Sequence, residues 1–290
     1  ANVTTADGTI AAGQYAAILH RIEAQNLQHL RWGTAAGKNL VLSFWVKSNK
    51  TGIYSLSTEK SDSTTYRRVN EFTINVANTW EQKTIKIPPL TNSNSGGTIT
   101  NDNGLGIKFE WCLAYGSTFT TTSLDQWITT AHFASTNQVN WMDSTSNNFY
   151  LTGVQLEVGT EATPFEHRSF DEEFILCQRY YQKSYVYGTA IGASTQEGFW
   201  STGGHQGGTS TGYIEGIINF ERVPRASPTL TLYDHSGNSG KCARLAAGTA
   251  RYANENVGTA QLCARGVVLY SASGTAAGII QAHYTVDAEL

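Results

Sequence analysis

The stretch Phe149–Tyr185, FYLTGVQLEVGTEATPFEHRSFDEEFILCQRYYQKSY, joins a β-rich first half of the chain to a β-rich second half. It begins as a core strand with apolar residues on both sides of Gly153. The alternation of apolar residues slips by one position at Gly153, which predicts a β-bulge there. Pro164 ends strand pairing, because proline has no backbone N–H to donate to a neighbouring strand.

One short helix is predicted after this turn. Ser169 can cap it, and Glu172, three residues later, can complete a capping box. The adjacent acids Asp171–Glu173 fall in the first helical turn, where they favour the positive end of the helix dipole. The predicted apolar stripe consists of Phe170, Phe174, Cys177 and Tyr181.

The opposite face of this helix is apolar as well, because it carries Ile175, Leu176 and Tyr180. A short helix that is apolar all round must be buried on both sides. The stripe can pack on its own domain, or it can line a symmetry axis against copies of itself. We expect the second arrangement, with the stripe as an oligomer interface.

The first half of the chain is predicted to be a β domain. Asn39–Lys47, NLVLSFWVK, is a clear strand, with Leu40, Leu42, Phe44 and Val46 on one side and Trp45 on the other. The stretch 16–30 fits strand or helix, and strand is favoured. Strands at intervals of about ten residues, separated by polar turns, are typical of a sandwich or jelly roll. Further strands are predicted at Gly52–Ser57, Arg68–Val76, Glu81–Ile87 and Gly106–Tyr115.

The second half is predicted to be another β domain, with short strands between Gly-rich loops. Only 15% of the residues are charged and 28 are glycine, a composition that favours an all-β protein. The predicted fold is therefore all-β: a jelly roll over 1–168, a connecting helix over 169–183 and a distal β-sandwich over 184–290. The distal strands are predicted at 184–189, 198–201, 212–220, 228–233, 266–271 and 278–286.

Charge and hydropathy exclude several classes of partner. The net charge is -3 and neither half has a basic stripe, so no nucleic acid is expected to bind. No apolar run reaches about 18 residues, so no insertion into a membrane is expected. The first ten residues, ANVTTADGTI, lack the pattern of a signal peptide and an initiator Met. We expect a domain cut from a longer protein.

The four cysteines form no CxxC pair, which makes zinc ligation unattractive. Cys112 and Cys177 are expected to be buried thiols. A disulfide between Cys242 and Cys263 is left open, as is a structural Ca²⁺ held by loop oxygens.

Several strings resemble bacteriophage proteins. GVQLEVGTEATPFEHRSFDEEFILCQRYYQKSY, over 153–185, resembles the junction of many tail-fibre and virion proteins, in which a jelly roll similar to carbohydrate-binding modules precedes a C-terminal β domain. HRIEAQNLQHLRWGTAAGKNLVLSFWVKSNKTGIYSL and NTWEQKTIKIP match the same pattern in order, and the resemblance covers nearly all of 1–168. FERVPRASPTLTLYDHSG and the ending HYTVDAEL resemble the distal domain of that family. The resemblance implies a homotrimer and a natural C-terminus.

No catalytic motif is present, and the chain is expected to be non-enzymatic, with no cofactor and no metal. It lacks HExxH, GxSxG and the phosphate-cradling GxxxxGK[ST]. Fibre-associated glycanases use two carboxylates. If the chain depolymerises a glycan, the first candidates are Asp102, Asp125 and Asp143 on predicted loops.

Aromatic residues are the remaining candidates for a site, because flat rings stack on sugar C–H bonds while polar groups bind hydroxyls. Trp200 and Tyr213 flank the loop 201–212, which holds five glycines, and His205 and Gln206 lie at its middle. Trp45 points away from the predicted core. For any one ring the alternative is a place in the core or in an interface, and Trp80 and Trp111 are examples for which this alternative is expected. The predicted glycan-binding residues are therefore Trp200, His205, Gln206, Tyr213 and Trp45.

The predicted function is attachment of a phage virion to a glycan on the host surface, with a location in the tail fibre or on the particle surface. The expected partners are two further copies of the chain, other virion proteins bound through a missing N-terminal region, and the glycan. Weak single sites would gain avidity from trimeric symmetry. A purely structural virion component, such as a capsid-decorating fibre or tail adaptor, is the main alternative, and a glycan depolymerase is the second.

Overall fold

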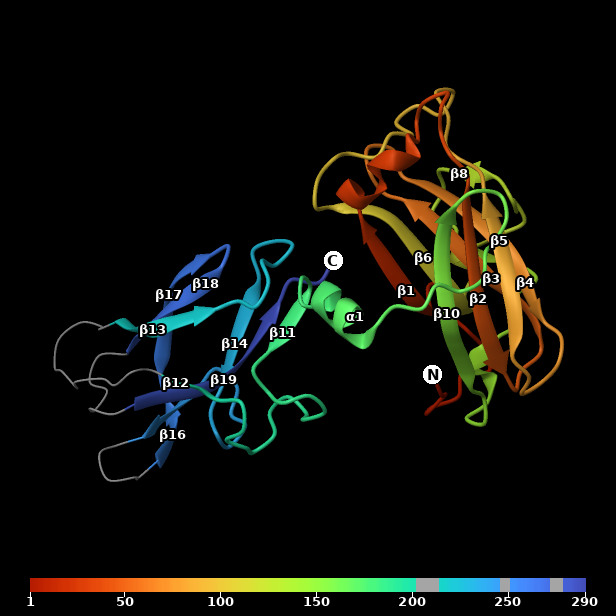
Figure 1. Cartoon of the computed structure of the whole chain (residues 1–290). Coiled ribbons are helices and arrows are strands. Elements are labelled where there is room, and N and C mark those ends of the chain that lie inside the picture. The colour runs from red at the N-terminus through yellow and green to blue at the C-terminus, as the bar shows by residue number, and fades with distance from the viewer. Residues whose placement is uncertain (202–213, 246–250, 272–278) are drawn as a thin grey trace. The chain divides into compact units, whose positions relative to one another are not determined.

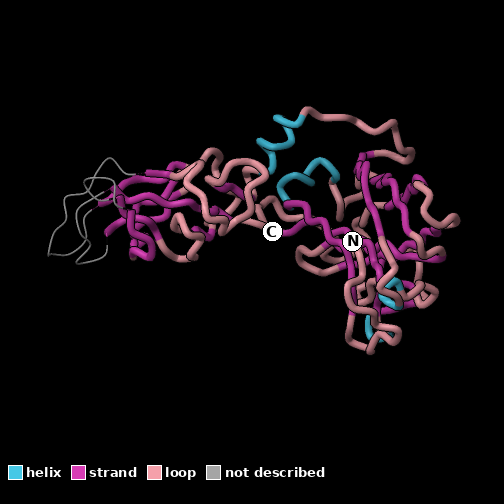
Figure 2. The backbone as a smooth tube through the Cα atoms, turned by 90° about the horizontal axis from the view of Figure 1, so that it is seen from below, coloured by secondary structure: helices cyan, strands magenta, loops and turns pink. Residues whose placement is uncertain are grey.

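The computed structural model describes residues 1–201, 214–245, 251–271 and 279–290. The chain divides into two compact units, which we describe separately. Unit 1 comprises residues 1–167 with Leu290, and unit 2 comprises residues 168–289. Strands dominate both units, and the helical segments are short (Figure 2). The predicted all-β class is confirmed.

Unit 1 is a sandwich of two antiparallel sheets (Figure 1). The chain passes between the sheets repeatedly, which is the connectivity of a jelly roll. One sheet has the strand order β1 (Tyr15–Glu23), β6 (Leu105–Tyr115), β3 (Gly52–Lys60), β4 (Tyr66–Ile74) and β8 (Trp127–Ile128). The other has the order β10 (Phe149–Val158), β2 (Leu40–Ser48) and β5 (Glu81–Ile87). A small parallel pair joins β7 (Thr120–Thr121) to β9 (Ala134–Ser135).

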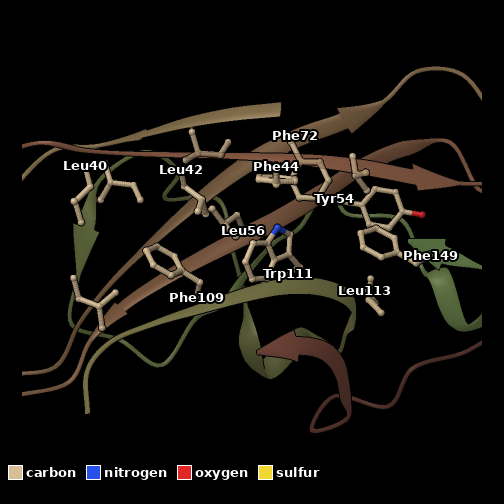
Figure 3. Packing of buried hydrophobic residues seen from close by; sticks show 14 of the residues in the cluster. Leu40, Leu42, Phe44, Tyr54, Leu56, Phe72, Phe109, Trp111, Leu113 and Phe149 are labelled. Carbon is tan, nitrogen blue, oxygen red and sulfur yellow. The ribbon is translucent and has the colours of Figure 1, made fainter. Parts of the chain in front are cut away.

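The core of unit 1 lies between these sheets and is built from the inward side chains of the alternating strands (Figure 3). Phe44 of β2 meets Trp111 of β6 at a ring-centroid distance of 5.7 Å, edge to face. Phe44, Leu56 and Trp111 are all at most 1% exposed. The side of β2 predicted to face the core does so. On its other side Trp45 is exposed and Lys47 half-buried, whereas Val41 and Ser43 are buried.

One local prediction for unit 1 is confirmed, and a second, a strand over 16–30, is right only as far as Glu23. The ladder between β10 and β2 shifts register between Thr152 and Gln155, and Gly153 has a φ of +56°, as expected of a bulge. The ambiguous stretch 16–30 is a strand to Glu23, followed by the 3₁₀ helix Ala24–Leu30.

Unit 2 is a second, smaller β assembly with its own core, which includes Ile218, Leu269 and Ile280. β19 is its central strand, because four other strands pair with it. One sheet contains β11 (Tyr181–Lys183), β12 (Trp200–Ser201), β14 (Thr229–Tyr233), β15 (Cys242–Leu245), β16 (Arg251–Glu255) and β19 (Ile279–Asp287). The other has the order β13 (Ile214–Asn219), β18 (Gly266–Ser271) and β17 (Val257–Cys263).

The connecting helix α1 spans Phe170–Cys177, which is shorter than the predicted 169–183. Its capping box is confirmed: the Glu172 backbone N–H donates to Ser169 Oγ, and the Glu172 carboxylate accepts from the Ser169 N–H at 3.0 Å. The helix ends early because Tyr181 already belongs to β11, where it pairs with Asp287 of β19. The predicted strand 184–189 is wrong, because β11 ends at Lys183. The chain then turns, and the Thr189 N–H donates to the Val186 carbonyl.

The four cysteines form no disulfide with one another. Cys112 is buried, as predicted, whereas Cys177 is exposed because α1 presents it outward. Cys242 is buried and Cys263 is exposed. Among the described residues, no helix has the length and hydropathy required to cross a membrane.

Candidate functional site

Three aromatic side chains gather on the outer surface of the three-stranded sheet of unit 1. Trp45 lies on β2, Tyr150 on β10, and Trp80 in the turn directly before β5. Their exposed fractions are 39%, 43% and 40%. We call this surface, with Lys47 between its rings, the aromatic face. Trp80 does not lie in the core, one of the two places expected for it, because the turn leaves its ring in solvent.

Lys47 connects two of these rings. It pairs with Tyr150 in the ladder between β2 and β10, so both side chains leave the sheet side by side. The Lys47 Nζ atom lies 4.7 Å from the centroid of the Tyr150 ring and 5.1 Å from that of Trp80. The two rings are 6.3 Å apart and tilted by 62°. This is the geometry of a cation held by the electron-rich faces of two rings.

The β-bulge makes room for Trp45. A Cβ atom added at Gly153 would lie 3.0 Å from Cδ1 of the Trp45 indole, which is tighter than ordinary van der Waals contact. The positive φ of Gly153 is also costly for any other residue. The bulge predicted from the sequence therefore belongs to the site. It sets the position of the Trp45 ring and requires glycine at position 153.

The turn that leads to Trp80 is held by the carboxylate of Glu81. The backbone N–H groups of Asn75 and Val76 each donate to this carboxylate at 2.8 Å, and the Lys83 ammonium donates at 2.6 Å. Burial alone would raise the pKa of Glu81, but these hydrogen bonds outweigh it and lower the pKa to about 2. The turn 75–80 is thereby fastened to β5, and Trp80 is placed above the sheet.

Polar side chains flank the rings. Gln82 and Thr152 are the register partners of Trp45 on its two neighbouring strands, and both are exposed. Within the described part of the chain, neither side chain makes a recorded hydrogen bond, so the amide and the hydroxyl are available to a ligand. One end of the sheet surface is closed by the segment 161–166, whose Thr163 bonds Glu157 and whose Glu161 pairs with Lys86 at 2.6 Å.

Unit 2 contains a second candidate, a cleft of about 730 Å³. Trp200 lines it, together with three residues of the predicted apolar stripe on and after α1, which we call the α1 stripe. A predicted sugar-binding residue and predicted interface residues therefore line the same cleft. Trp200 is half-buried, and its indole N–H donates to the Ile217 carbonyl at 3.2 Å. The stripe residues in the lining are Phe174, Cys177 and Tyr181. His205, Gln206 and Tyr213 lie outside the described residues.

The fourth stripe residue, Phe170, is 62% exposed and stacks on Phe174 at 5.8 Å. Ile175 and Leu176 are 41% and 51% exposed. Within unit 2, α1 therefore carries apolar side chains in solvent on both of its faces.

The three loop carboxylates considered for catalysis each have local structural partners. Asp143 pairs with Lys50, Asp125 accepts a hydrogen bond from Asn70, and Asp102 accepts the Gly104 N–H at 2.8 Å. Hydrogen bonding by Lys50 is the main reason why the pKa of Asp143 is lowered. Across the described ranges, no three His, Cys, Asp or Glu side chains gather in a way that could hold a metal ion.

Comparison with known proteins adds little to this geometry. No family model matches the chain, and no curated protein matches it. Among solved structures, the chain is similar to one named "Family 16 Carbohydrate Binding Module-2", with 12% sequence identity and a TM-score of 0.23. The match covers 51% of this chain and 73% of that one. A likeness this weak carries no argument about a ligand, so any function must be argued from the residues described above.

Proposed function

We propose that the chain binds carbohydrate without transforming it, and that the aromatic face of unit 1 is the binding site. The observation that carries the proposal is the exposure of Trp45, Trp80 and Tyr150, each about two-fifths exposed, on one sheet surface. Leaving large rings in water forgoes the stabilisation that their burial would provide. Contiguous exposed apolar surface on a folded domain is typical of an interaction site.

The chemistry of this face matches a sugar. The apolar face of a pyranose stacks on an aromatic ring, while its hydroxyls need donors and acceptors at the rim. Gln82 and Thr152 supply such groups on both sides of Trp45. The face is open, so it suits a polymer chain lying across the strands, and each contact would be weak alone.

In its finer form, the proposal is attachment of a bacteriophage particle to a host glycan by a trimer of this chain. Its support is the resemblance of residues 153–185 to tail-fibre junctions and the two exposed apolar sides of α1, which a second and third copy would cover. Three copies would present three aromatic faces, and their avidity would exceed the affinity of one.

The trimer is tested by light scattering at micromolar concentration. We expect three times the 31.5 kDa mass of the chain. Phe174→Asp should give single chains, because an unpaired carboxylate in an apolar interface costs several kcal/mol. A wild-type protein that scatters as one chain would remove the trimer from the proposal and leave the binding site untouched.

The binding site is tested on a glycan array with three variants. Trp80→Ala should lose the wild-type signal, whereas Trp200→Ala should keep it. Tyr15→Ala is the matched control, because Tyr15 is 62% exposed on β1 of the other sheet. Loss with Trp200→Ala alone would move the site to the cleft of unit 2. A blank array for the wild type would favour a purely structural component, and shorter products from a bound polymer would favour a depolymerase.

A further inference from the structure

We infer that the glycan bound by the aromatic face is acidic, and that Lys47 recognises a carboxylate on the sugar. This inference rests on the proposed function and names its ligand class. The observation behind it is the position of one ammonium group at the centre of the site, between two rings and with no counter-ion among the residues that the structure describes.

Lys47 differs from the other lysines of unit 1. Lys50, Lys83, Lys86 and Lys108 each have a carboxylate within ion-pairing distance, at Asp143, Glu81, Glu161 and the pair Glu59 and Glu110. Lys60 instead donates to three backbone carbonyls. Lys38 is exposed and needs no partner other than water.

Lys47 is only partly exposed, and within the described residues no carboxylate forms an ion pair with it. The carboxylate nearest in the ladder is already engaged. It belongs to Glu81, the register partner of Val46, and it accepts from the turn 75–80 and from Lys83. A partly desolvated ammonium compensated only by ring faces attracts an anion more strongly than a fully hydrated lysine does.

The same geometry selects the kind of anion. A uronic acid carries its carboxylate at the edge of a pyranose ring whose C–H face is free to stack. The ammonium lies over the faces of the Trp80 and Tyr150 rings, about 5 Å from both centroids. Trp45 precedes Lys47 by two residues on β2 and leaves the same side of the sheet, so a sugar stacked on Trp45 brings its edge toward the ammonium. Stacking and ion pairing can therefore be made by one sugar residue at one place.

The experiment uses the full chain and three acidic polymers with carboxylates: polygalacturonate, hyaluronan and alginate. Each is compared with its carboxyl-reduced form, which keeps the linkages and loses the charge. Equilibrium binding is measured by affinity electrophoresis. We expect the wild type to bind at least one acid form about tenfold more tightly than its reduced form, as a charge-assisted contact implies. Added salt should weaken that preference.

The variants separate recognition from general charge. Lys47→Met should bind the acid form only as well as the reduced form, and Lys47→Arg should keep the preference. Lys38→Met changes the net charge equally, so it should behave as wild type. A melting temperature close to that of the wild type shows that Lys47→Met has kept its fold. If that variant melts early, Lys47→Arg and the polymer pairs still decide the question.

The failures are distinguishable. Equal binding of acid and reduced forms overturns the inference and leaves carbohydrate binding in place. A preference for the acid form that persists in Lys47→Met also overturns the inference, because a residue other than Lys47 would then bind the carboxylate. Binding to none of the six polymers, with a glycan array on which only neutral sugars bind, overturns it as well. A wholly blank array overturns the proposed function itself.

Discussion

The two outer surfaces of the unit 1 sandwich are opposites. On the five-stranded sheet, charged side chains are buried: Glu59 and Glu110 are 6% and 4% exposed. Lys108 lies between them, at 3.3 Å and 2.5 Å, and the segment 116–139 contributes the ring of Phe133 over Lys108 at 5.4 Å. On the three-stranded sheet, aromatic rings face solvent. One surface is thus closed by the domain itself, and the other is open to solvent.

This contrast shows which residues serve the fold. A buried charge without its partner destabilises a domain strongly, whereas an exposed ring can be removed at little cost. Variants of the closed surface should therefore change stability with little effect on binding, and variants of the open surface should do the reverse.

The largest expected effect is on the closed surface. Lys108→Met leaves two buried carboxylates with one cation fewer, and should lower the free energy of unfolding of unit 1 by about 3 kcal/mol. Urea unfolding measures it. Lys86→Met is the control, because its partner Glu161 is exposed and its stability should stay near wild type. Equal stability of Lys108→Met and wild type would contradict the assignment of this surface to the fold.

Glu81→Gln tests the link between stability and the open surface. The folded-state pKa of Glu81 is about 2 and its ordinary value is 4.5, so its stabilisation is complete above pH 4.5 and is lost as the pH falls toward 2. The variant should lose on the order of 1 to 3 kcal/mol at pH 7. It should also lack this part of the acid dependence, and should bind glycan less well because Trp80 is no longer held. If the stabilities of wild type and Glu81→Gln fall equally between pH 7 and pH 2, the stabilising role of the Glu81 carboxylate is refuted.

Gly153→Ala should cost about 1 kcal/mol through its backbone conformation and should displace the Trp45 ring. Gly188→Ala is a matched control, because Gly188 has a φ of +86° and no atom within 4 Å of its added Cβ. Both variants carry backbone strain, but only Gly153→Ala should weaken glycan binding. A similar change of affinity in both would separate the bulge from the site.

The smallest effect is expected for Gln82→Ala. Its stability should lie within about 0.5 kcal/mol of wild type, because the side chain is exposed and the described residues give it no hydrogen bond. Its affinity for glycan should fall roughly threefold, as loss of one neutral hydrogen bond implies. Isothermal calorimetry with the glycan selected on the array measures this. Unchanged affinity would leave the rings and Lys47 as the recognition elements.

Much of unit 1 could be predicted from the sequence because its strands alternate regularly. The pattern around Phe44 identified Trp45 as outward, and the slip at Gly153 identified the bulge. Trp80 was missed because it lies in a turn, where no alternation exists to give its direction. Lys47 and Tyr150 are far apart in the sequence, and only the strand register brings them together.

Unit 2 was less predictable. β15, β16 and β17 were missed because the sequence from Lys241 to Arg265 is rich in Ala and shows no clear alternation. The meeting of Trp200 with the α1 stripe was also beyond the sequence, since it depends on how β12 pairs with β19. The roles of Trp200 and of the stripe stay predictions.

The most direct test of carbohydrate binding by the aromatic face is a crystal structure of the chain with an oligosaccharide selected on the array. We predict a sugar ring stacked on Trp45, Trp80 or Tyr150, with its polar edge toward Lys47 and the Gln82 amide. A sugar bound in the Trp200 cleft or on the five-stranded surface, with the aromatic face empty, would contradict the account.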